Sequence, residues 1–408
     1  MPHNHRPNAV ELIVSAATAL KDKRDEVNKL NVFPVPDGDT GTNMSLTMDA
    51  VVAEVRKLPE GATLAEIAHA ITHGSLMGAR GNSGVILSQI LRGLCEGFTG
   101  VDHVDVQTVA AALDRSVTVA FQAVRKPVEG TMLTVLRDAA TAAPRAAEAG
   151  EDITGVLEAV VIEAFESVRR TPDLLPVLKE SGVVDAGGYG LAILFEGFSA
   201  GLSGHEIRSF DVTVRENVEP ILSTGTTDDW DDDEYLYCTE FLMFGTGMDR
   251  VAIEDFMVSI GGSQLVVGTP DQLKVHVHTD DPSEALAYAL QVGEVAEVHV
   301  HNMRRQSAER AQSLRDEAQD LKPLGFVAVA AGEGLTEILK SLGVDAVVGG
   351  GQTMNPSTAE LLEAIDAVPA HTVIVLPNNK NIIMAANQTV GLASKEVGVV
   401  PTTAVPQA

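Results

Sequence analysis

Two aspartates near the start of the chain, Asp37 and Asp39, have the residue type and spacing needed to bind a divalent cation. Prolines at 34 and 36 restrict the backbone before them, and glycines at 38 and 41 allow tight turns that aim both carboxylates at one point. Mg²⁺ takes few protein oxygens and shares the rest of its coordination with water and phosphate. Hydroxyl and amide groups follow at a predicted helix N-terminus, which favours an anion: Thr40, Thr42 and Asn43. The motif predicts a metal–triphosphate site; the alternative is an ordinary Asp-Gly turn with a helix cap.

A second segment suited to an anion runs from Met77 to Gly84 and leads into an apolar helical pattern over 85–98. Neither a Walker A motif nor a Rossmann fingerprint is present, because no lysine follows the glycines and no strand precedes them. Alone, the segment indicates a close crossing of two helices, but beside the aspartate loop it predicts a phosphate cradle. Glycines at 78, 81 and 84 would let backbone amides approach a ligand, and Ser83 adds a hydroxyl at the helix start. Arg80 is a candidate for steadying phosphate charge or for a salt bridge to the aspartates.

Two further polar or glycine-rich turns lead into helices, Lys126–Met132 and Val183–Gly188. Four such turns predict one rim of a helical bundle that faces a common ligand. Helical periodicity, with no convincing strand before residue 205, predicts an all-α first domain of roughly eight helices. We expect helices over 9–30, 44–56, 85–98, 106–124, 131–143 and 154–170, one opened by a capping box at Thr63 and Glu66, and a short one from Pro172 capped by Thr171.

Histidines at alternate positions offer a second kind of site farther along the chain. His276 and His278 lie on one face of a predicted strand, because side chains alternate along a strand. That spacing suits Zn²⁺, and Cys238 on another predicted strand could supply a third ligand. The residues alone slightly favour the alternative of two strand histidines and a small buried cysteine, since no Cys-x-x-Cys accompanies them. His299 and His301 repeat the spacing and are candidates for a fourth ligand or for surface positions.

The last part of the chain has the pattern of an α/β domain. An acidic stretch at 206–234 is typical of a linker, and a polar connector follows the segment Asn302–Gln306. From Leu324, continuous apolar strands alternate with helices, which predicts a parallel sheet covered on both faces. Gly349–Ser357 follows a strand and precedes a helix, the position where open α/β sheets bind ligands. The number of predicted strands is small for a complete sheet of this class.

Composition argues against several classes of partner. The 408 residues carry a formal net charge of -28, which argues against nucleic acid and anionic membranes. Only two cysteines occur, so there is no disulfide framework and a reducing compartment is expected. The N-terminus lacks an apolar signal core, and no uncharged apolar run reaches membrane-spanning length. We therefore expect a soluble cytoplasmic protein without a transmembrane segment, which handles nucleotides through metal and backbone amides.

Together these motifs resemble the ATP-binding subunit of bacterial fatty acid kinase, whose N-terminal domain is similar to the nucleotide-binding domain of dihydroxyacetone kinase. The resemblance rests on two long strings, Asn31-Val-Phe-Pro-Val-Pro-Asp-Gly-Asp-Thr-Gly-Thr-Asn-Met44 and Gly74-Ser-Leu-Met-Gly-Ala-Arg-Gly-Asn-Ser-Gly-Val-Ile-Leu-Ser-Gln89. Shorter strings at 275–282, 350–358 and 376–382 extend it across nearly the whole chain.

The resemblance implies a multidomain protein. An all-α helical barrel that binds ATP and Mg²⁺ would occupy 1–205, and the acidic linker 206–234. An α+β zinc-binding and dimerisation domain would follow over 235–320, and a partial DegV-like α/β domain over 321–408. Family members continue beyond residue 408, so we expect a fragment or a shortened relative.

The resemblance also implies roles for particular residues. Two Mg²⁺ ions would be held by Asp37 and Asp39, with Asn31 at about the place where dihydroxyacetone kinases carry a further aspartate. Phosphates would be held by Thr42, Asn43 and the turn of Gly81, Asn82, Ser83 and Gly84. Four residues would border the nucleotide: Thr131, Met132, Asp185 and Gly187. A structural Zn²⁺ would be bound by Cys238, His276 and His278, which overturns the slight preference for strand histidines without a metal.

The activity implied is transfer of the ATP γ-phosphate to the carboxylate of a fatty acid presented by a separate DegV-family subunit. The product would be an acyl-phosphate for phospholipid synthesis, and the chain would form a homodimer. A carboxylate is already ionised at neutral pH, so catalysis reduces to positioning and charge neutralisation. Two alternatives remain open: a kinase for a small hydroxylated substrate such as dihydroxyacetone, and a nucleotide-sensing scaffold without transfer activity.

Overall fold

The computed structural model describes residues 9–59, 61–101, 103–208, 235–319, 322–349, 356–393 and 395–407. The chain divides into two compact units, 1–310 and 311–408. It is multidomain, with a helical N-terminal region followed by two separate sheets. Most of the predicted linker, from residue 209 onward, lies outside the described residues, as do residues 350–355 of the predicted ligand loop.

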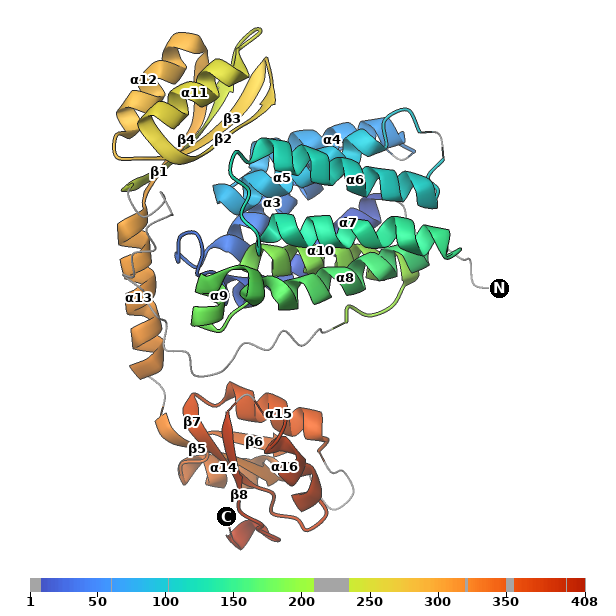
Figure 1. Ribbon diagram of the computed structural model, residues 1–408. Helices are drawn as coiled ribbons and strands as arrows, with labels where there is room; N and C mark the ends of the chain where they lie inside the picture. The colour runs from blue at the N-terminus through green and yellow to red at the C-terminus, as the bar shows by residue number, and fades with distance from the viewer. Residues whose placement is uncertain are drawn as a thin grey trace. The chain divides into compact units, whose positions relative to one another are not determined.

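Every regular element in the described part of the N-terminal region is a helix, and the loops between the helices include the aspartate loop (Figure 1). Its helices are α1 (Ala9–Asp22), α2 (Arg24–Lys29), α3 (Thr40–Val55), α4 (Leu64–Gly78), α5 (Gly81–Gly97), α6 (Val106–Ala123), α7 (Met132–Glu148), α8 (Ile153–Leu174), α9 (Pro176–Ser181) and α10 (Ala186–Ser203). Alanine, valine and leucine fill the core between them, so the helices pack closely. The capping box predicted at Thr63 and Glu66 is confirmed at the start of α4. The expectation of a single helix over 9–30 is wrong, because the chain breaks at Lys23.

The short helix predicted to begin at Pro172 does not begin there. Pro172 lies inside α8, and the following short helix, α9, begins at Pro176 after Leu175. A proline cannot donate to the carbonyl four residues earlier, which here belongs to Val168. The hydroxyl of Thr171 donates to that carbonyl instead, at 2.7 Å, so the helix continues through the proline.

The middle part of the first unit is an antiparallel sheet with helices on one face (Figure 1). The sheet has the order β2-β3-β1-β4. Its elements are β1 (Tyr237–Phe244), α11 (Arg250–Ile260), β2 (Gly261–Thr269), β3 (Gln272–Thr279), α12 (Pro282–Val292) and β4 (Glu294–Asn302). Phe241, Met243, Val275 and Val277 form the core beneath α11 and α12. The polar connector expected after Gln306 is wrong, since α13 (Met303–Gln319) continues there.

The opposite face of this sheet packs against the helical region. Leu265 and Val267 of β2 join one apolar cluster with Leu76, Ala79 and Val85 of the α4–α5 junction. Because side chains alternate along β3 and β1, the polar residues of these strands face the same helices. The predicted histidine positions and the predicted phosphate cradle are therefore neighbours within one unit.

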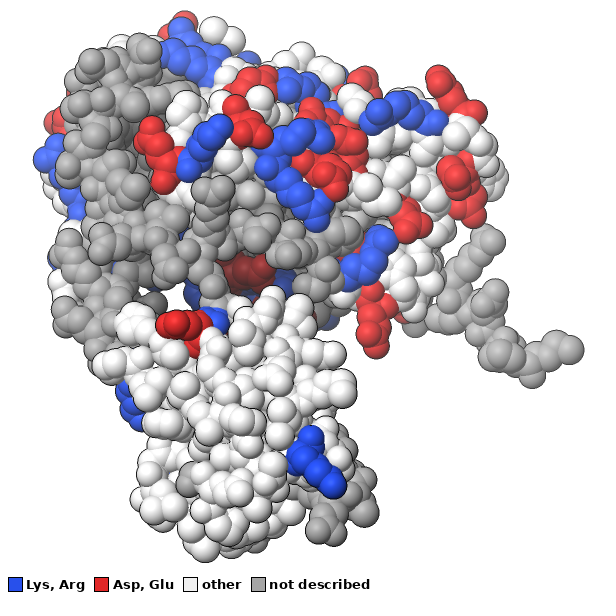
Figure 2. Space-filling view, turned by 60° about the horizontal axis from the view of Figure 1, so that its bottom comes forward, with Lys and Arg blue, Asp and Glu red and all other residues white. Residues whose placement is uncertain are grey.

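The C-terminal unit is a parallel sheet, as predicted, in the order β6-β5-β7-β8. Its elements are β5 (Lys322–Ala330), α14 (Glu333–Ser341), β6 (Ala346–Gly349), α15 (Thr358–Ala367), β7 (Ala370–Leu376), α16 (Ile383–Thr389), β8 (Glu396–Val399) and a short 3₁₀ helix, η2 (Val405–Gln407). The face of this unit seen in Figure 2, at the bottom of the view, carries few charged side chains. Ile338, Leu342, Met384 and Leu392 are exposed apolar residues of the unit. Among the described residues, the structure contains no helix with the length and apolar character needed to cross a membrane.

Candidate active site

Asn31 organises the loop that carries the two aspartates. Its side-chain nitrogen Nδ2 donates to the carbonyl of Val35 at 3.1 Å, and its Oδ1 accepts from the backbone N–H of Asp39 at 3.1 Å. These bonds fold the loop back on itself, which brings Asp37 and Asp39 together. The carboxamide of Asn31 is thus used by the loop backbone, and its role as a metal ligand stays a prediction.

The two carboxylates interact strongly. Burial, and then the negative charge of Asp39, raise the pKa of Asp37 to about 8. Burial also raises the pKa of Asp39, partly offset by hydrogen bonds from Asp37 and Asn43. Ionising both of two partly buried, adjacent carboxylates costs free energy, so the pair retains a proton near neutral pH. A divalent cation relieves the same repulsion, which makes the pair well suited to Mg²⁺.

The helix after the aspartates starts earlier than predicted. α3 begins at Thr40 rather than Met44, directly after Asp39. Thr40, Thr42 and Asn43 therefore lie in its first turn, and the N–H of Asn43 already donates to the carbonyl of Asp39 at 2.8 Å. Thr42 is held by Asn28, whose Oδ1 accepts from the Thr42 N–H and whose Nδ2 donates to the Thr42 hydroxyl, both at 3.0 Å.

The turn in the glycine-rich segment is shorter than predicted. α4 runs through Gly78 and α5 begins at Gly81, so the residues assigned to a turn form the first turn of α5. Gly78 and Gly84 face α3 so closely that a Cβ on either would collide with it. For these two glycines the alternative of a close helix crossing is correct. Gly81 has φ +57 and lies against the Asn43 side chain, which places the start of α5 beside the aspartate loop.

A cavity of about 580 Å³ is lined by residues from all four predicted turns, within the range usual for small-molecule sites. Seven predicted residues line it: Thr40, Asn82, Ser83, Thr131, Met132, Asp185 and Gly187. Asp37 and Asp39 do not line the cavity, but Thr40, which follows them directly, does. The four predicted turns therefore contribute to one cavity, and a common ligand there stays a prediction.

Sequence reasoning missed part of the cavity wall. Arg125 and Lys126 line it, although the sequence indicates Lys126 only as the start of a turn. These cations give an acidic protein local positive charge where a phosphate would lie. The middle domain supplies the opposite side, with Val258 of α11 and residues 261–265 of β2. Nothing in the sequence signals this wall, because it depends on contacts between distant segments.

Asp185 lies at the base of the cavity as the cap of α10. Its Oδ2 accepts from the N–H of Gly188 at 2.6 Å, and its own N–H donates to the hydroxyl of Thr171 at 3.0 Å. Burial raises the pKa of Asp185 to about 7, although the N–H groups of Gly188 and Met132 favour the charged form. The carboxylate caps the first turn of α10, and a positive charge nearby would lower its pKa.

The polar face of the middle sheet gathers the predicted metal ligands. Cys238 is opposite His278 on β3, and its Sγ, with one ring nitrogen each of His276 and His278, forms a group whose atoms lie within 4.8 Å of one another. Burial lowers the pKa of His278 to about 3, which keeps this imidazole neutral. Against the effect of burial, Cys238 and Glu240 raise the pKa of His276 to about 10, so a metal ion at His276 has to displace a proton. His301 is also opposite Cys238, across β4, but is not part of this group.

Two buried charged residues on the same face were not singled out from sequence. Glu240 accepts from Nδ1 of His276 at 2.8 Å, and Lys274 is fully buried. Arg80 contacts Nε2 of His299, and its positive charge is one of those that lower the pKa of Glu240. Arg80 therefore joins the start of α5 to the middle sheet, a contact that neither predicted role anticipated.

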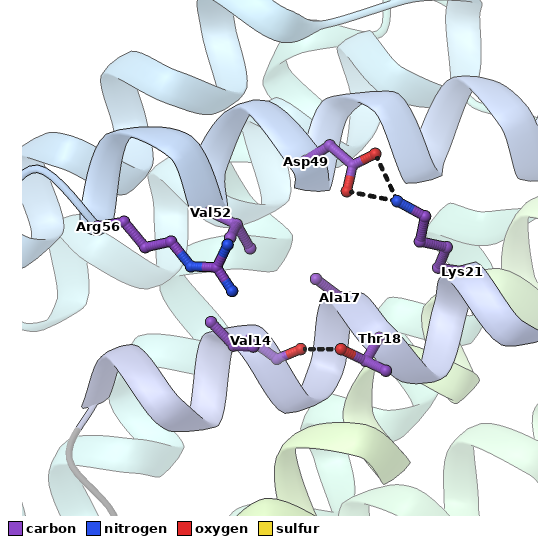
Figure 3. A pocket seen from close by; sticks show the side chains of 7 residues that line it. All are labelled: Val14, Ala17, Thr18, Lys21, Asp49, Val52 and Arg56. Atoms are coloured by element: carbon purple, nitrogen blue, oxygen red, sulfur yellow. Dashed lines mark hydrogen bonds and ion pairs between the residues drawn. The ribbon is translucent and has the colours of Figure 1, made fainter.

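A smaller cavity of about 170 Å³ lies between α1 and α3 (Figure 3). Lys21 pairs with Asp49 there at 3.3 Å, and both side chains are about half exposed. An exposed pair of this kind contributes little to stability or binding. None of the predicted site residues lines this cavity.

Comparison with known proteins identifies the family of this chain. Three domain families match: the DAK2 domain over 34–200, and the middle and C-terminal domains of FakA-like proteins, a class of fatty acid kinase subunits, over 234–310 and 325–408. Protein YloV of Bacillus subtilis is 42% identical over 417 residues, covering 97% of this chain and 74% of that protein. The chain belongs to the FakA-like family of fatty acid kinase subunits.

Other relatives extend the comparison. An uncharacterized protein of Staphylococcus haemolyticus is 40% identical over 411 residues, with the same coverage of 97% and 74%. The crystal structure of a dihydroxyacetone kinase from C. freundii with AMP-PNP and Mg²⁺ is 20% identical, covers 47% of this chain and 34% of that chain, and has a TM-score of 0.37. Membership of the FakA-like family supports a kinase subunit, and such a subunit implies a partner subunit.

Proposed function

We propose that this chain is the nucleotide-binding subunit of a fatty acid kinase. One observation carries the proposal: a partly buried pair of mutually repelling carboxylates, Asp37 and Asp39, immediately precedes Thr40 at a cavity lined from four helix starts. Buried carboxylate pairs are unstable without a proton or a cation, and helix starts attract anions. Metal and triphosphate are the ligands that satisfy both features at once.

The residues present fit MgATP. Asp37 and Asp39 would hold Mg²⁺, and the first turn of α5, with Arg125 and Lys126, would hold the phosphates. Mg²⁺ supplies charge neutralisation at the transferred phosphoryl group. The chain would orient the nucleotide, and the middle domain supplies part of the cavity wall through Val258 and residues 261–265.

The proposed acceptor is the carboxylate of a fatty acid. A carboxylate oxygen forms a bond to the γ-phosphorus while the bond from that phosphorus to the bridging oxygen breaks, giving an acyl-phosphate and ADP. Because the acceptor is already ionised, no proton has to be removed. This fits a cavity with acidic and cationic residues but no histidine among those lining it.

We further propose a structural zinc ion on the middle sheet. Cys238, His276 and His278 offer a thiolate and two imidazoles, a donor set suited to Zn²⁺, and Nε2 of His276 is a buried nitrogen without a hydrogen-bond partner among the described residues. The ion would stiffen the sheet that covers the cavity. The proposed division of the chain is a barrel-like kinase domain over 1–205, a zinc-binding and dimerisation domain over 235–320, and a DegV-like domain over 321–408.

The C-terminal unit is the proposed docking region for a DegV-family subunit that presents the fatty acid. Exposed apolar side chains such as Ile338 and Leu342 support this role, since such residues are common where proteins bind one another. The acyl chain would be held by the partner, and this chain would supply the phosphoryl group.

The test is a coupled assay with partner subunit, fatty acid and MgATP. The variant Asp37→Ala should lose acyl-phosphate formation, whereas Asp49→Ala, in an exposed ion pair on α3, should retain it. Equal activity of wild type and Asp37→Ala would overturn the metal assignment. Phosphorylation of dihydroxyacetone in place of the fatty acid, or tight MgATP binding without turnover, would overturn the proposed reaction.

A further inference from the structure

Glu240 is a buried carboxylate in the middle of the central strand β1, only 3% exposed. Its neighbours across the sheet are His276 on β3 and His299 on β4. The adjacent residue Phe241 points to the core beneath α11 and α12, so Glu240 is on the face that carries Cys238 and His276. A buried carboxylate is retained at such a position only when it has a defined partner.

That partner is one nitrogen of His276. Nδ1 of His276 lies 2.8 Å from Oε1 of Glu240 and 3.8 Å from Sγ of Cys238. A carboxylate at 2.8 Å is a far stronger acceptor than sulfur at the longer distance, so the proton on Nδ1 points to Glu240. The other nitrogen, Nε2, is buried and has no hydrogen-bond partner among the described residues. The hydrogen bond at Nδ1 therefore leaves Nε2 as the donor atom for a metal.

We infer that Glu240 is a positioning residue of the zinc site, which holds His276 so that Nε2, and not Nδ1, faces the ion. Metal-bound histidines commonly donate their second N–H to a carboxylate, and that bond fixes both the tautomer and the ring orientation. Without Glu240, the nearest described partner of Nδ1 is Cys238, itself one of the ligands. The site would then lose both the ring orientation and a free thiolate. This inference rests on the zinc ion of the proposed function.

Glu240 also interacts electrostatically with the aspartate pair. Its negative charge contributes to the raised pKa of Asp39, and Arg80 at the start of α5 acts on Glu240 in turn. Loss of the Glu240 charge changes the electrostatics of the aspartate pair as well as the zinc site. The affinities for zinc and for MgATP are therefore measured separately in each variant.

The test uses the full chain and measures zinc affinity by competition with a chelating dye. Glu240→Gln removes the charged acceptor and is expected to weaken zinc binding by about 10–100-fold. Glu297→Gln is the matched control, since Glu297 lies on the same sheet near His299 but does not contact His276. It removes one negative charge as well, and its zinc affinity should stay within about threefold of wild type. Equal weakening in both variants would show that only charge matters and would overturn the inference.

A second measurement does not depend on any change at Glu240. In ¹⁵N-histidine spectra of the zinc-loaded wild type, with His276 assigned through His276→Gln, the proton should be on Nδ1 and the metal on Nε2. A proton on Nε2 would overturn the inference while leaving zinc binding intact. If the wild type binds no more zinc than Cys238→Ser, the zinc ion of the proposed function fails, and the role of Glu240 fails with it. Retained zinc affinity in a folded Glu240→Gln protein would refute the inference alone.

Discussion

Replacement of Asp37 by asparagine should stabilise the metal-free protein while abolishing its function. The pKa of Asp37 is raised to about 8 from 3.8, first by burial and then by the charge of Asp39. At pH 7 the unfolded chain has this carboxyl ionised, whereas the native pair keeps a proton. The roughly three pKa units between 3.8 and pH 7 correspond to about 4 kcal/mol at about 1.36 kcal/mol per unit, an upper bound on the penalty. Asparagine has nearly the same shape and no charge, so it avoids most of this penalty.

The same substitution removes a metal ligand. Loss of charge neutralisation at the transferred phosphoryl group should lower kcat/KM by about 10²–10³-fold or more. The assay is paired: urea unfolding in metal-free buffer, and thermal shift on addition of MgATP. Asp37→Asn should unfold at higher urea than wild type and show little shift with MgATP. Asp49→Asn, an exposed change on the nearby helix α3, should behave as wild type in both measurements.

Two outcomes would refute this reasoning. A metal-free Asp37→Asn protein that is less stable than wild type would mean that the aspartate pair is not repulsive and that the charged form is already compensated. A variant that keeps the full MgATP shift would mean that the metal binds elsewhere. The two measurements test different claims: stability in metal-free urea is expected to rise, and the thermal shift with MgATP is expected to fall. Each outcome therefore refutes either the electrostatic argument or the metal assignment.

The aspartate pair, the start of α5 and the zinc ligands each give one further prediction. Mg²⁺ affinity should rise about tenfold per pH unit below pH 8 and level off above it, because the cation must displace the proton on Asp37; titration calorimetry at several pH values would check this. Over pH 4 to 8 the metal-free wild type should lose stability relative to Asp37→Asn as pH rises, since native Asp37 keeps a proton that the unfolded chain releases; urea unfolding of both proteins would check it. Gly81→Ala should destabilise the protein by about 1–2 kcal/mol, because φ at this position is +57 and a Cβ would collide with the side chain of Asn43. It should also weaken nucleotide binding. An unaltered MgATP affinity would show that the start of α5 does not bind the phosphates. Cys238→Ser should lower bound zinc, by elemental analysis, and lower the midpoint of thermal unfolding; unchanged metal content would exclude this cysteine as a ligand.

The elements of the helical region were largely predictable because their signals are local. Apolar periodicity and the capping box at Thr63 gave the positions of several helices, although boundaries were displaced. α3 starts four residues before Met44 because Gly41 fits against α2, where a side chain would collide with the backbone of Arg24. The sequence pattern ends α8 too early, because the proline leaves the carbonyl of Val168 without its usual donor and the hydroxyl of Thr171 donates to it instead. Both errors arise from contacts that propensity alone does not encode.

The middle domain was harder to predict because its strands and helices are short and unevenly buried. β4 has mostly exposed or half-buried residues and a bulge near Glu297, so it lacks the alternation that identifies a strand. The shared face of His276 and His278 followed from strand geometry and is confirmed. Glu240 was missed because its partner is 36 residues away, and nothing local distinguishes it from a surface glutamate.

An acidic protein that handles a triphosphate must avoid repelling it, and the buried carboxylates indicate how this chain does so. Asp37 and Asp185 have pKa values raised to about 8 and about 7, so near neutral pH the cavity region carries less negative charge than its composition implies. Arg125 and Lys126 add positive charge at the cavity wall. A cation that displaces the proton of the aspartate pair leaves the local charge no more negative than before. The net charge of -28 is therefore compatible with a phosphate site, because local charge near a ligand depends on protonation and metal binding rather than on the chain total.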